Sequence, residues 1–216
     1  MGLADGKLES TSERPRRVIV LDDDPFVLET LKSWLSLNGF EVSAYESADK
    51  MLASGPPKAP ACLVLDNQLG GGWTGLQVHE KIRQLTWKVS TVFLTAHWDP
   101  AYIVQAMKAG AEGFLIKPFD PHELLEAVAL ALEKAEAMES SDQHAADARA
   151  LAALLTQREL EIVKMVIKGL INKEIANQLD LALVTVKVHR GRAMRKLRAG
   201  NPAELVHIAG MAGLIA

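Results

Sequence analysis

The chain has 216 residues, 49% of them hydrophobic, which suits one large domain or two modest domains with cores of their own. The net charge of −3 conceals a split, because residues 1–150 carry 14 basic and 22 acidic residues, whereas residues 151–216 carry 10 and 5. An acidic front part and a basic tail predict two domains, of which the second faces an anionic partner. On charge alone, the alternative is that the acidic and the basic surface are both simply solvated and that neither faces a charged partner.

Cysteine content and the N-terminal sequence indicate the cellular compartment of the protein. Cys62 is the only cysteine, so no disulfide can form within the chain, and a reducing compartment fits best. Residues 1–17 lack the apolar run of a secretory signal, and no stretch approaches the length that crosses a bilayer. We therefore expect a soluble, cytoplasmic protein with no membrane partner.

In chain order, a flexible tail over residues 1–16 is followed by alternating strand and helix patterns. Short apolar runs, many of them β-branched, predict strands at 17–21, 40–45, 61–66, 89–95 and 113–116. Helices are predicted at 26–38, 48–53, 74–85, 99–109 and 120–138. Asp99 and Asp120 each precede a proline, the pattern of an N-cap followed by proline at the first helical position. The alternation predicts the α/β class, with a doubly wound five-stranded parallel sheet over residues 17–138.

The remaining chain contains no strand pattern. Residues 139–152 are polar and alanine-rich, and we take them as a linker, for which a helix is one option. From residue 153 to residue 216 one helical pattern follows another, which predicts a small all-α domain.

Polar side chains follow four of the predicted strands at their carboxyl ends. They are Asp22 and Asp23, Asp66, Thr95 and Lys117. In a parallel α/β sheet these ends share one edge, where ligands bind. Carboxylates suit Mg²⁺, and an ammonium and a hydroxyl can hold phosphoryl oxygens. The arrangement predicts that Asp66 accepts a phosphoryl group while Mg²⁺ neutralises charge.

These segments resemble the receiver domain of bacterial two-component response regulators, which has a flavodoxin-like fold. The resemblance covers residues 18–138 and rests on VLDDDP, LVLDNQ, VFLTAHWD and AMKAGAEGFLIKPF. It implies that a sensor histidine kinase phosphorylates Asp66. It also implies that Asp23, Asp66 and the main-chain carbonyl of Gln68 ligate Mg²⁺, with Asp22 helping through water. Asp24 is expected to face solvent.

The same resemblance implies a switch pair and a cis peptide. Thr95 and Phe114 would form the switch, the hydroxyl moving toward the phosphoryl group as the ring turns inward. The peptide between Lys117 and Pro118 would be cis, a geometry that proline makes accessible.

One loop departs from the receiver pattern. Gly70 stands where the family usually has proline, and the glycine-rich loop that follows is one residue longer. The departure leaves the lifetime of the phosphoryl group open. Trp98, close after Thr95, either gates the site or is a surface aromatic.

An enzyme is the competing hypothesis for the acidic site. Asp22-x-Asp24 resembles the first motif of haloacid-dehalogenase-type phosphotransferases. That family expects Thr or Val where Phe26 stands, and the hypothesis leaves Asp66 without a role. We therefore expect a protein that is not an enzyme.

The basic tail predicts a helix-turn-helix. Thr156 and Glu159 form a capping-box pattern, and Asn172 is expected to cap the next helix. The helix after that places Val186 and Ala193 on an apolar face, and residues 185–198 hold six basic residues and no acid. The last helix, 202–212, either serves dimerisation or packs against the others.

The segments LTQRE, KGLINKEIANQL, TVKVHRGRAMRKL and NPAELVHIAG resemble the LuxR-type DNA-binding domain, and the whole chain resembles a FixJ/NarL-type response regulator. Lys187 and Val188 would then face base edges, whereas Arg190, Arg192, Arg195 and Lys196 would hold phosphates. The residues expected at the DNA interface are Thr185, Lys187, Val188, Arg190, Gly191, Arg192, Arg195 and Lys196.

Two features of this helix are unusual for the family. Ala182 lies where a capping Ser or Thr is common, so the helix should lack a side-chain cap. Leu183, Val184 and Gly191 make the expected DNA face apolar and smooth, which favours contacts to thymine methyl groups.

Together these features predict a transcription regulator switched by phosphorylation. Phosphorylation would favour a homodimer that binds double-stranded promoter DNA and acts on the transcription machinery. The alternative is a regulator that binds DNA independently of phosphate and carries a vestigial receiver.

Overall fold

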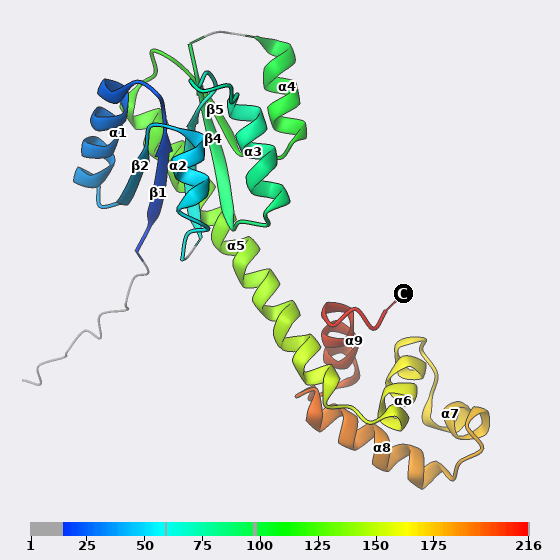
Figure 1. Cartoon of the computed structure of the whole chain (residues 1–216). Helices are drawn as coiled ribbons and strands as arrows, with labels where there is room; N and C mark the ends of the chain where they lie inside the picture. The colour runs from blue at the N-terminus through cyan, green and yellow to red at the C-terminus, as the bar shows by residue number, and fades with distance from the viewer. Residues whose placement is uncertain (1–14, 59, 97–98, 216) are drawn as a thin grey trace, which may run out of the picture. The chain divides into compact units, whose positions relative to one another are not determined.

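Figure 1 shows the computed structural model, which describes residues 15–58, 60–96 and 99–215. These residues form a five-stranded parallel sheet in the order β2-β1-β3-β4-β5. The strands are β1 (Arg17–Leu21), β2 (Glu41–Tyr45), β3 (Ala61–Asp66), β4 (Val89–Thr95) and β5 (Gly113–Ile116). The helices that alternate with them are α1 (Pro25–Leu37), α2 (Ala48–Ala53), α3 (Gly75–Gln84), α4 (Pro100–Lys108) and α5 (Pro121–Ala153). The predicted doubly wound, flavodoxin-like sheet is confirmed.

Helices cover both faces of this sheet. Successive residues of a strand point to opposite faces, and apolar residues on both faces need to be covered. On one face, Val18 and Val20 of β1 pack with the buried residues of α1 and α5. On the other face, Ile19 and Leu21 of the same strand pack with those of α2, α3 and α4. The central strand β3 is buried at every position, as a strand covered on both sides must be.

Side-chain caps start several of these helices. Asp24 and Asp99 accept hydrogen bonds from N–H groups in the first turns of α1 and α4, and Thr74 forms a capping box with Gln77 at α3. Gly39 and Gly110 follow α1 and α4 with φ of +85° and +93°, a conformation that glycine adopts without strain. The predicted cap at Asp99 is confirmed.

Helix α5 is longer than expected. The prediction ended it at residue 138, but it continues without a break to Ala153 and includes the whole segment 139–152. That segment contains no glycine or proline and several alanines, so nothing in it interrupts a helix. The described residues form two compact units, which divide between Glu139 and Ser140.

The second unit contains α6 (Gln157–Ile167), α7 (Asn172–Gln178), α8 (Leu183–Lys196) and α9 (Pro202–Met211). Its core includes Ile162, Ile175, Val186, Leu205 and Ala209. Because Leu205 and Ala209 of α9 are fully buried in this core, the last helix packs against the others, one of the two roles considered for it.

One predicted cap in this unit is wrong. Asn172 is the first residue of α7 and not its N-cap, which is Ile171. The N–H of Ile171 donates to Glu174, so the glutamate satisfies this helix end. The Asn172 side chain instead accepts a hydrogen bond from Arg190 at 2.7 Å.

Two expectations concern parts of the chain that are not described. The predicted tail falls largely within residues 1–14, and the gate proposed for Trp98 falls within 97–98; both lie outside the described residues. In the described part of the chain, no helix combines the length and apolarity that crossing a membrane requires.

Candidate functional site

A lysine joins two buried carboxylates at the carboxyl edge of the sheet. Asp22 directly follows β1, Asp66 ends β3, and Lys117 directly follows β5. The Lys117 ammonium donates to Asp22 Oδ2 at 2.8 Å and to Asp66 Oδ1 at 2.7 Å. Three side chains that are 44 to 95 positions apart in the sequence therefore form one charged cluster, because parallel strands end at a shared edge.

The cluster carries an excess of negative charge in a sheltered place. Asp22 and Asp66 are only 2% and 7% exposed. Burial raises the pKa of Asp66, and the ammonium of Lys117 acts against this effect. Burial by itself lowers the pKa of Lys117, but its hydrogen bonds to the two aspartates outweigh this and raise it, so the ammonium stays charged at neutral pH. Two carboxylates that share one cation attract a further cation.

The three consecutive aspartates have different environments. Asp22 is buried against Lys117, and its other oxygen accepts the N–H of Asp24 at 2.9 Å. Asp24 is exposed and caps α1 by accepting the N–H of Phe26 at 2.8 Å. Asp23 is exposed, and a Cβ built at Gly70 would lie 3.1 Å from its carboxylate oxygen. Asp24 is thus a helix cap, whereas Asp22 belongs to the charged cluster and Asp23 lies beside Gly70.

The oxygen donors at this edge fit Mg²⁺. Mg²⁺ in proteins commonly takes one or two carboxylates and completes its shell with water and phosphate oxygens. Asp22 and Asp66 both accept hydrogen bonds from Lys117. The main-chain N–H of Gln68 donates to Asp66 Oδ2 at 2.6 Å, so the Gln68 backbone also borders the site. Among the residues that the structure describes, no group of three or more His, Cys, Asp or Glu side chains is already arranged around a metal position. Two carboxylates are nevertheless enough for this ion.

The start of α3 lies very close to the end of β3. Gly75 donates its N–H to the Asn67 carbonyl at 2.9 Å. A Cβ at Gly75 would lie 2.6 Å from the Asp66 carbonyl oxygen and 3.1 Å from the Phe93 ring. Only glycine allows this approach, which keeps the backbone around Asp66 in place.

An aromatic cluster lies beneath the site. Thr95, the last residue of β4, is buried, and its carbonyl accepts the N–H of Lys117 at 2.7 Å. Phe114 is partly buried and stacks on Phe93 with ring centres 6.2 Å apart, and Tyr102 lies 6.1 Å from Phe114. Sequence reasoning missed Phe93 and Tyr102, because a buried strand aromatic and a helical tyrosine carry no sign that they meet Phe114.

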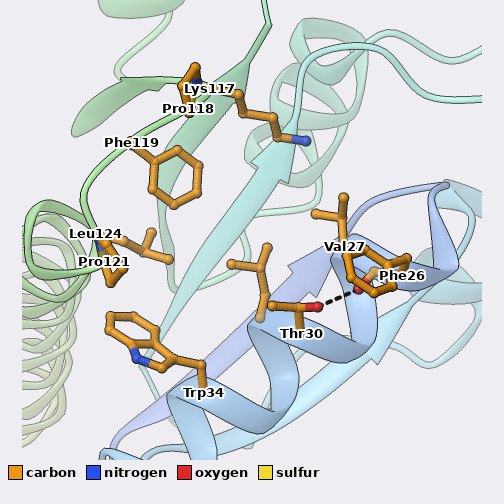
Figure 2. Close-up of a pocket in the computed structure, with 10 residues that line it drawn as sticks. Phe26, Val27, Thr30, Trp34, Lys117, Pro118, Phe119, Pro121 and Leu124 are labelled. Atoms are coloured by element: carbon orange, nitrogen blue, oxygen red, sulfur yellow. Dashed lines mark hydrogen bonds between the residues drawn. The ribbon is translucent and has the colours of Figure 1, made fainter.

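An apolar pocket of about 360 Å³ lies beside Lys117. Figure 2 shows the side chains that line it. One wall comes from α1 and the other from residues 117–124, so the sequence contained no signal for it. Phe26 at its rim is 79% exposed. The lining residues are Phe26, Val27, Thr30, Leu31, Trp34, Lys117, Pro118, Phe119, Pro121 and Leu124. The peptide bond between Lys117 and Pro118 is cis, as predicted.

The basic residues of α8 fall into two groups. Lys187, Arg192 and Arg195 are exposed. Arg190 and Lys196 are partly buried and hold bonds within their own unit, Arg190 with Asn172 and Lys196 with Glu159 Oε2 at 2.7 Å. The freely exposed cations of this helix therefore differ from those that stabilise the domain.

The exposed side of α8 also carries apolar side chains. Val184 is 66% exposed and Val188 is 45% exposed. Gly191, one turn beyond Val188, is exposed, and a Cβ there would meet nothing within 4 Å. Thr185 is partly exposed, and Ala182 starts the helix without a side-chain cap, as expected. The helix thus presents a smooth apolar strip beside exposed cations.

Two family models match the chain. Residues 18–129 match the response regulator receiver domain, and residues 153–209 match the bacterial regulatory proteins of the luxR family. The first match covers the sheet and its charged edge, and the second covers α6, α7, α8 and most of α9.

Individual proteins are similar over nearly the whole chain. Nodulation protein W of Bradyrhizobium diazoefficiens is 38% identical over 92% of this chain and 87% of its own length. Transcriptional regulatory protein FixJ of Rhizobium meliloti is 35% identical over 89% of this chain and 94% of its own. Among solved structures, response regulator StyR is 38% identical with a TM-score of 0.79, over 91% of this chain and 99% of that one.

Proposed function

Because the chain belongs to the DNA-binding two-component response regulators, with a receiver domain and a LuxR-type helix-turn-helix, we propose that Mg²⁺-dependent phosphorylation of Asp66 switches it. The phosphoryl donor is a sensor histidine kinase, and the protein acts in the cytoplasm. The observation that carries the proposal is the bridge of Lys117 to the buried carboxylates of Asp22 and Asp66. Proteins of this family regulate transcription and are not enzymes, which sets aside a phosphotransferase that uses Asp22.

Each side chain at the sheet edge has a role in the transfer. An Asp66 oxygen attacks the phosphorus of the phosphohistidine, the P–N bond breaks, and the kinase imidazole leaves. Lys117 then holds a phosphoryl oxygen, and the Thr95 hydroxyl holds another. Asp22, Asp23, Asp66 and the Gln68 carbonyl would bind Mg²⁺, which neutralises the charge of the phosphoryl oxygens.

The aromatic cluster carries the signal away from Asp66. When Thr95 moves toward the phosphoryl group, the space beside it admits the Phe114 ring, which already borders Phe93 and Tyr102. The new position of the ring changes the surface over α4 and β5 and favours a homodimer. Phosphorylation can shift this equilibrium only by its different free energy of interaction with the two states.

The pocket beside Lys117 suits the approach of the kinase. A kinase must place its phosphohistidine at Asp66, so its docking surface has to border the mouth of the site. The pocket does so through Lys117, and the exposed Phe26 adds apolar contact area.

The second unit binds double-stranded DNA through α8. Lys187, Arg192 and Arg195 are free to contact phosphates or base edges. Arg190 and Lys196 are partly buried and already bonded to Asn172 and Glu159, so only their remaining N–H donors are available for DNA. Val184 and Val188 contact thymine methyl groups in the major groove. The dimer presents two such helices to adjacent half-sites and acts on the transcription machinery.

The first experiment is an intact-mass measurement after incubation with acetyl phosphate and Mg²⁺. We expect a gain of one phosphoryl group in the wild type, and no gain in Asp66→Asn or after chelation of the metal. A gain that survives Asp66→Asn would contradict Asp66 as the acceptor.

A second candidate function rests on the glycine loop. Its extra residue and the absence of proline at Gly70 fit a regulator that binds DNA independently of phosphate. Equal DNA affinity of the phosphorylated and unphosphorylated protein would favour this candidate.

A further inference from the structure

The loop between Asp66 and α3 forms a small hairpin at the mouth of the site. An antiparallel bridge between Gln68 and Thr74 closes its base. At its tip, Gly71 and Gly72 have φ of +76° and +87°, and a Cβ at either would meet nothing within 4 Å. The Cβ positions of the tip therefore face open space, and the place of the tip depends on the contacts that the rest of the loop makes.

On either side of the tip the loop comes close to another segment of the domain. Gly70 lies against the Asp23 carboxylate, where a Cβ would come within 3.1 Å of Oδ2. Trp73 donates its indole N–H to Asp49 Oδ1 of α2 at 3.1 Å, and its partly buried ring packs on the core shared by α2, α3 and α4. The tryptophan thus fastens the loop to a helix that is itself capped by Ser47.

We propose that Trp73 and Asp49 are positioning residues that hold the glycine loop over the phosphorylated Asp66 and prolong the life of the phosphoryl group. The inference rests on the proposed function, since it concerns the product of that reaction. Neither residue touches the reacting atoms. They act through Gly70, which the indole–carboxylate bond keeps beside Asp23.

Hydrolysis is the step that this arrangement slows. A water oxygen attacks phosphorus, and the bond from phosphorus to the Asp66 oxygen breaks. The products are the free Asp66 carboxylate and inorganic phosphate, and the two protons of the water pass to the phosphate and the solvent. The attacking water must reach phosphorus from the open side of the site. A fastened loop covers that side, and a released loop admits water.

The test compares the half-life of the phosphoryl group in four full-length proteins. They are the wild type, Trp73→Phe, Asp49→Ala and Asp49→Asn, labelled with acetyl phosphate and followed by intact mass at saturating Mg²⁺. Trp73→Phe removes the N–H but keeps a ring, and Asp49→Ala removes the acceptor. We expect both to shorten the half-life by about fivefold, the rate factor for one net hydrogen bond of about 1 kcal/mol.

Asp49→Asn is the matched control, because its amide oxygen can still accept the indole N–H. We expect its half-life to stay close to that of the wild type. The double variant Trp73→Phe/Asp49→Ala should lose no more than either single variant, since both remove the same bond. Chemical denaturation at the assay temperature shows that each variant is folded during the measurement.

Unchanged or longer half-lives in both Trp73→Phe and Asp49→Ala would overturn the inference, as would a loss in Asp49→Asn equal to that in Asp49→Ala. The initial mass distinguishes this failure from failure of the proposed function. If the wild type gains no phosphoryl group at all, the proposed function is wrong and the inference falls with it.

Discussion

Single residues at the carboxyl edge combine burial, charge and close approach. Lys117 is held by two carboxylates, so its removal would leave both of them buried without a cation. Asp24 differs from its two neighbours because it serves the helix and not the site. At this scale the clearest test is the effect on stability of adding a methyl group at Gly75.

We expect Gly75→Ala to lower the free energy of unfolding of the first unit by about 1–3 kcal/mol, the usual range for overpacking, because the added methyl would lie 2.6 Å from the Asp66 carbonyl oxygen. Gly113→Ala is the matched control, since a Cβ there meets its nearest neighbour at 3.5 Å, an ordinary contact. All tryptophans of the chain precede residue 99, so tryptophan fluorescence in a urea titration reports this unit. Equal stability of the two variants would contradict the steric argument.

At the scale of elements, the start of α6 depends on one buried glutamate. Glu159 is 2% exposed, completes the capping box with Thr156, and binds the ammonium of Lys196 from α8. Burial would raise the pKa of Glu159, but Lys196 and the Thr156 N–H and hydroxyl outweigh burial and lower it. This glutamate thus ties two helices of the DNA-binding unit together.

We expect Glu159→Ala to lower the free energy of unfolding of this unit by about 1–3 kcal/mol at pH 7, through loss of a charged hydrogen bond and a cap. Glu159→Gln is the control that keeps the capping geometry but removes the charge. Because the folded-state pKa lies below the ordinary one, the stabilisation by the charge is complete above the ordinary value of 4.5 and is lost as pH falls through the folded-state value.

Amide hydrogen exchange in α6 and α8 as a function of pH measures this effect. The gap between wild type and Glu159→Gln should close in acid. A gap that stays constant from neutral pH down to full protonation would show that the charge contributes nothing.

The apolar strip of α8 leads to a prediction about DNA. We expect duplexes selected from a random library by the phosphorylated protein to contain thymines in contact with α8. Replacing one such thymine by uracil should weaken binding by about fourfold, because burial of one methyl group contributes about 0.8 kcal/mol. Val184→Ala should bind the thymine and uracil duplexes with more similar affinity than the wild type does. Selected sites that are indifferent to uracil would exclude methyl contacts and leave DNA binding itself intact.

At the scale of the whole molecule, the proposed switch couples a receiver to a DNA-binding unit through a change of assembly. We expect phosphorylation by acetyl phosphate and Mg²⁺ to strengthen self-association at least about tenfold, equivalent to about 1.4 kcal/mol. Affinity for a two-half-site duplex should rise with it, because two linked contacts act together. Sedimentation velocity measures the assembly, and Asp66→Asn under the same conditions is the control. A protein that gains the phosphoryl group but stays unchanged in sedimentation would contradict a dimerisation switch.

Local patterns were enough to predict much of this molecule. The alternation of apolar strands and helices predicted the parallel sheet, because a strand covered on both faces must be apolar throughout, as β3 is. The position of Asp22, Asp66 and Lys117 at the carboxyl ends of β1, β3 and β5 predicted that they would meet, because the topology of a parallel sheet brings such ends to one edge. Capping at Asp99 and Thr156 followed from short-range residue order.

Contacts between distant segments decided the rest. Arg190 pairs with Asn172 and Lys196 with Glu159, so two basic residues that resemble DNA contacts in sequence serve the packing of their own unit. The aromatic cluster around Phe114, the pocket beside Lys117 and the bond from Trp73 to Asp49 join residues from separate elements. The sequence by itself determined which elements form and where their polar ends lie, because these depend on local propensity and periodicity. Only the tertiary structure decided which partner each side chain finds, because that choice depends on distances between segments remote in the chain.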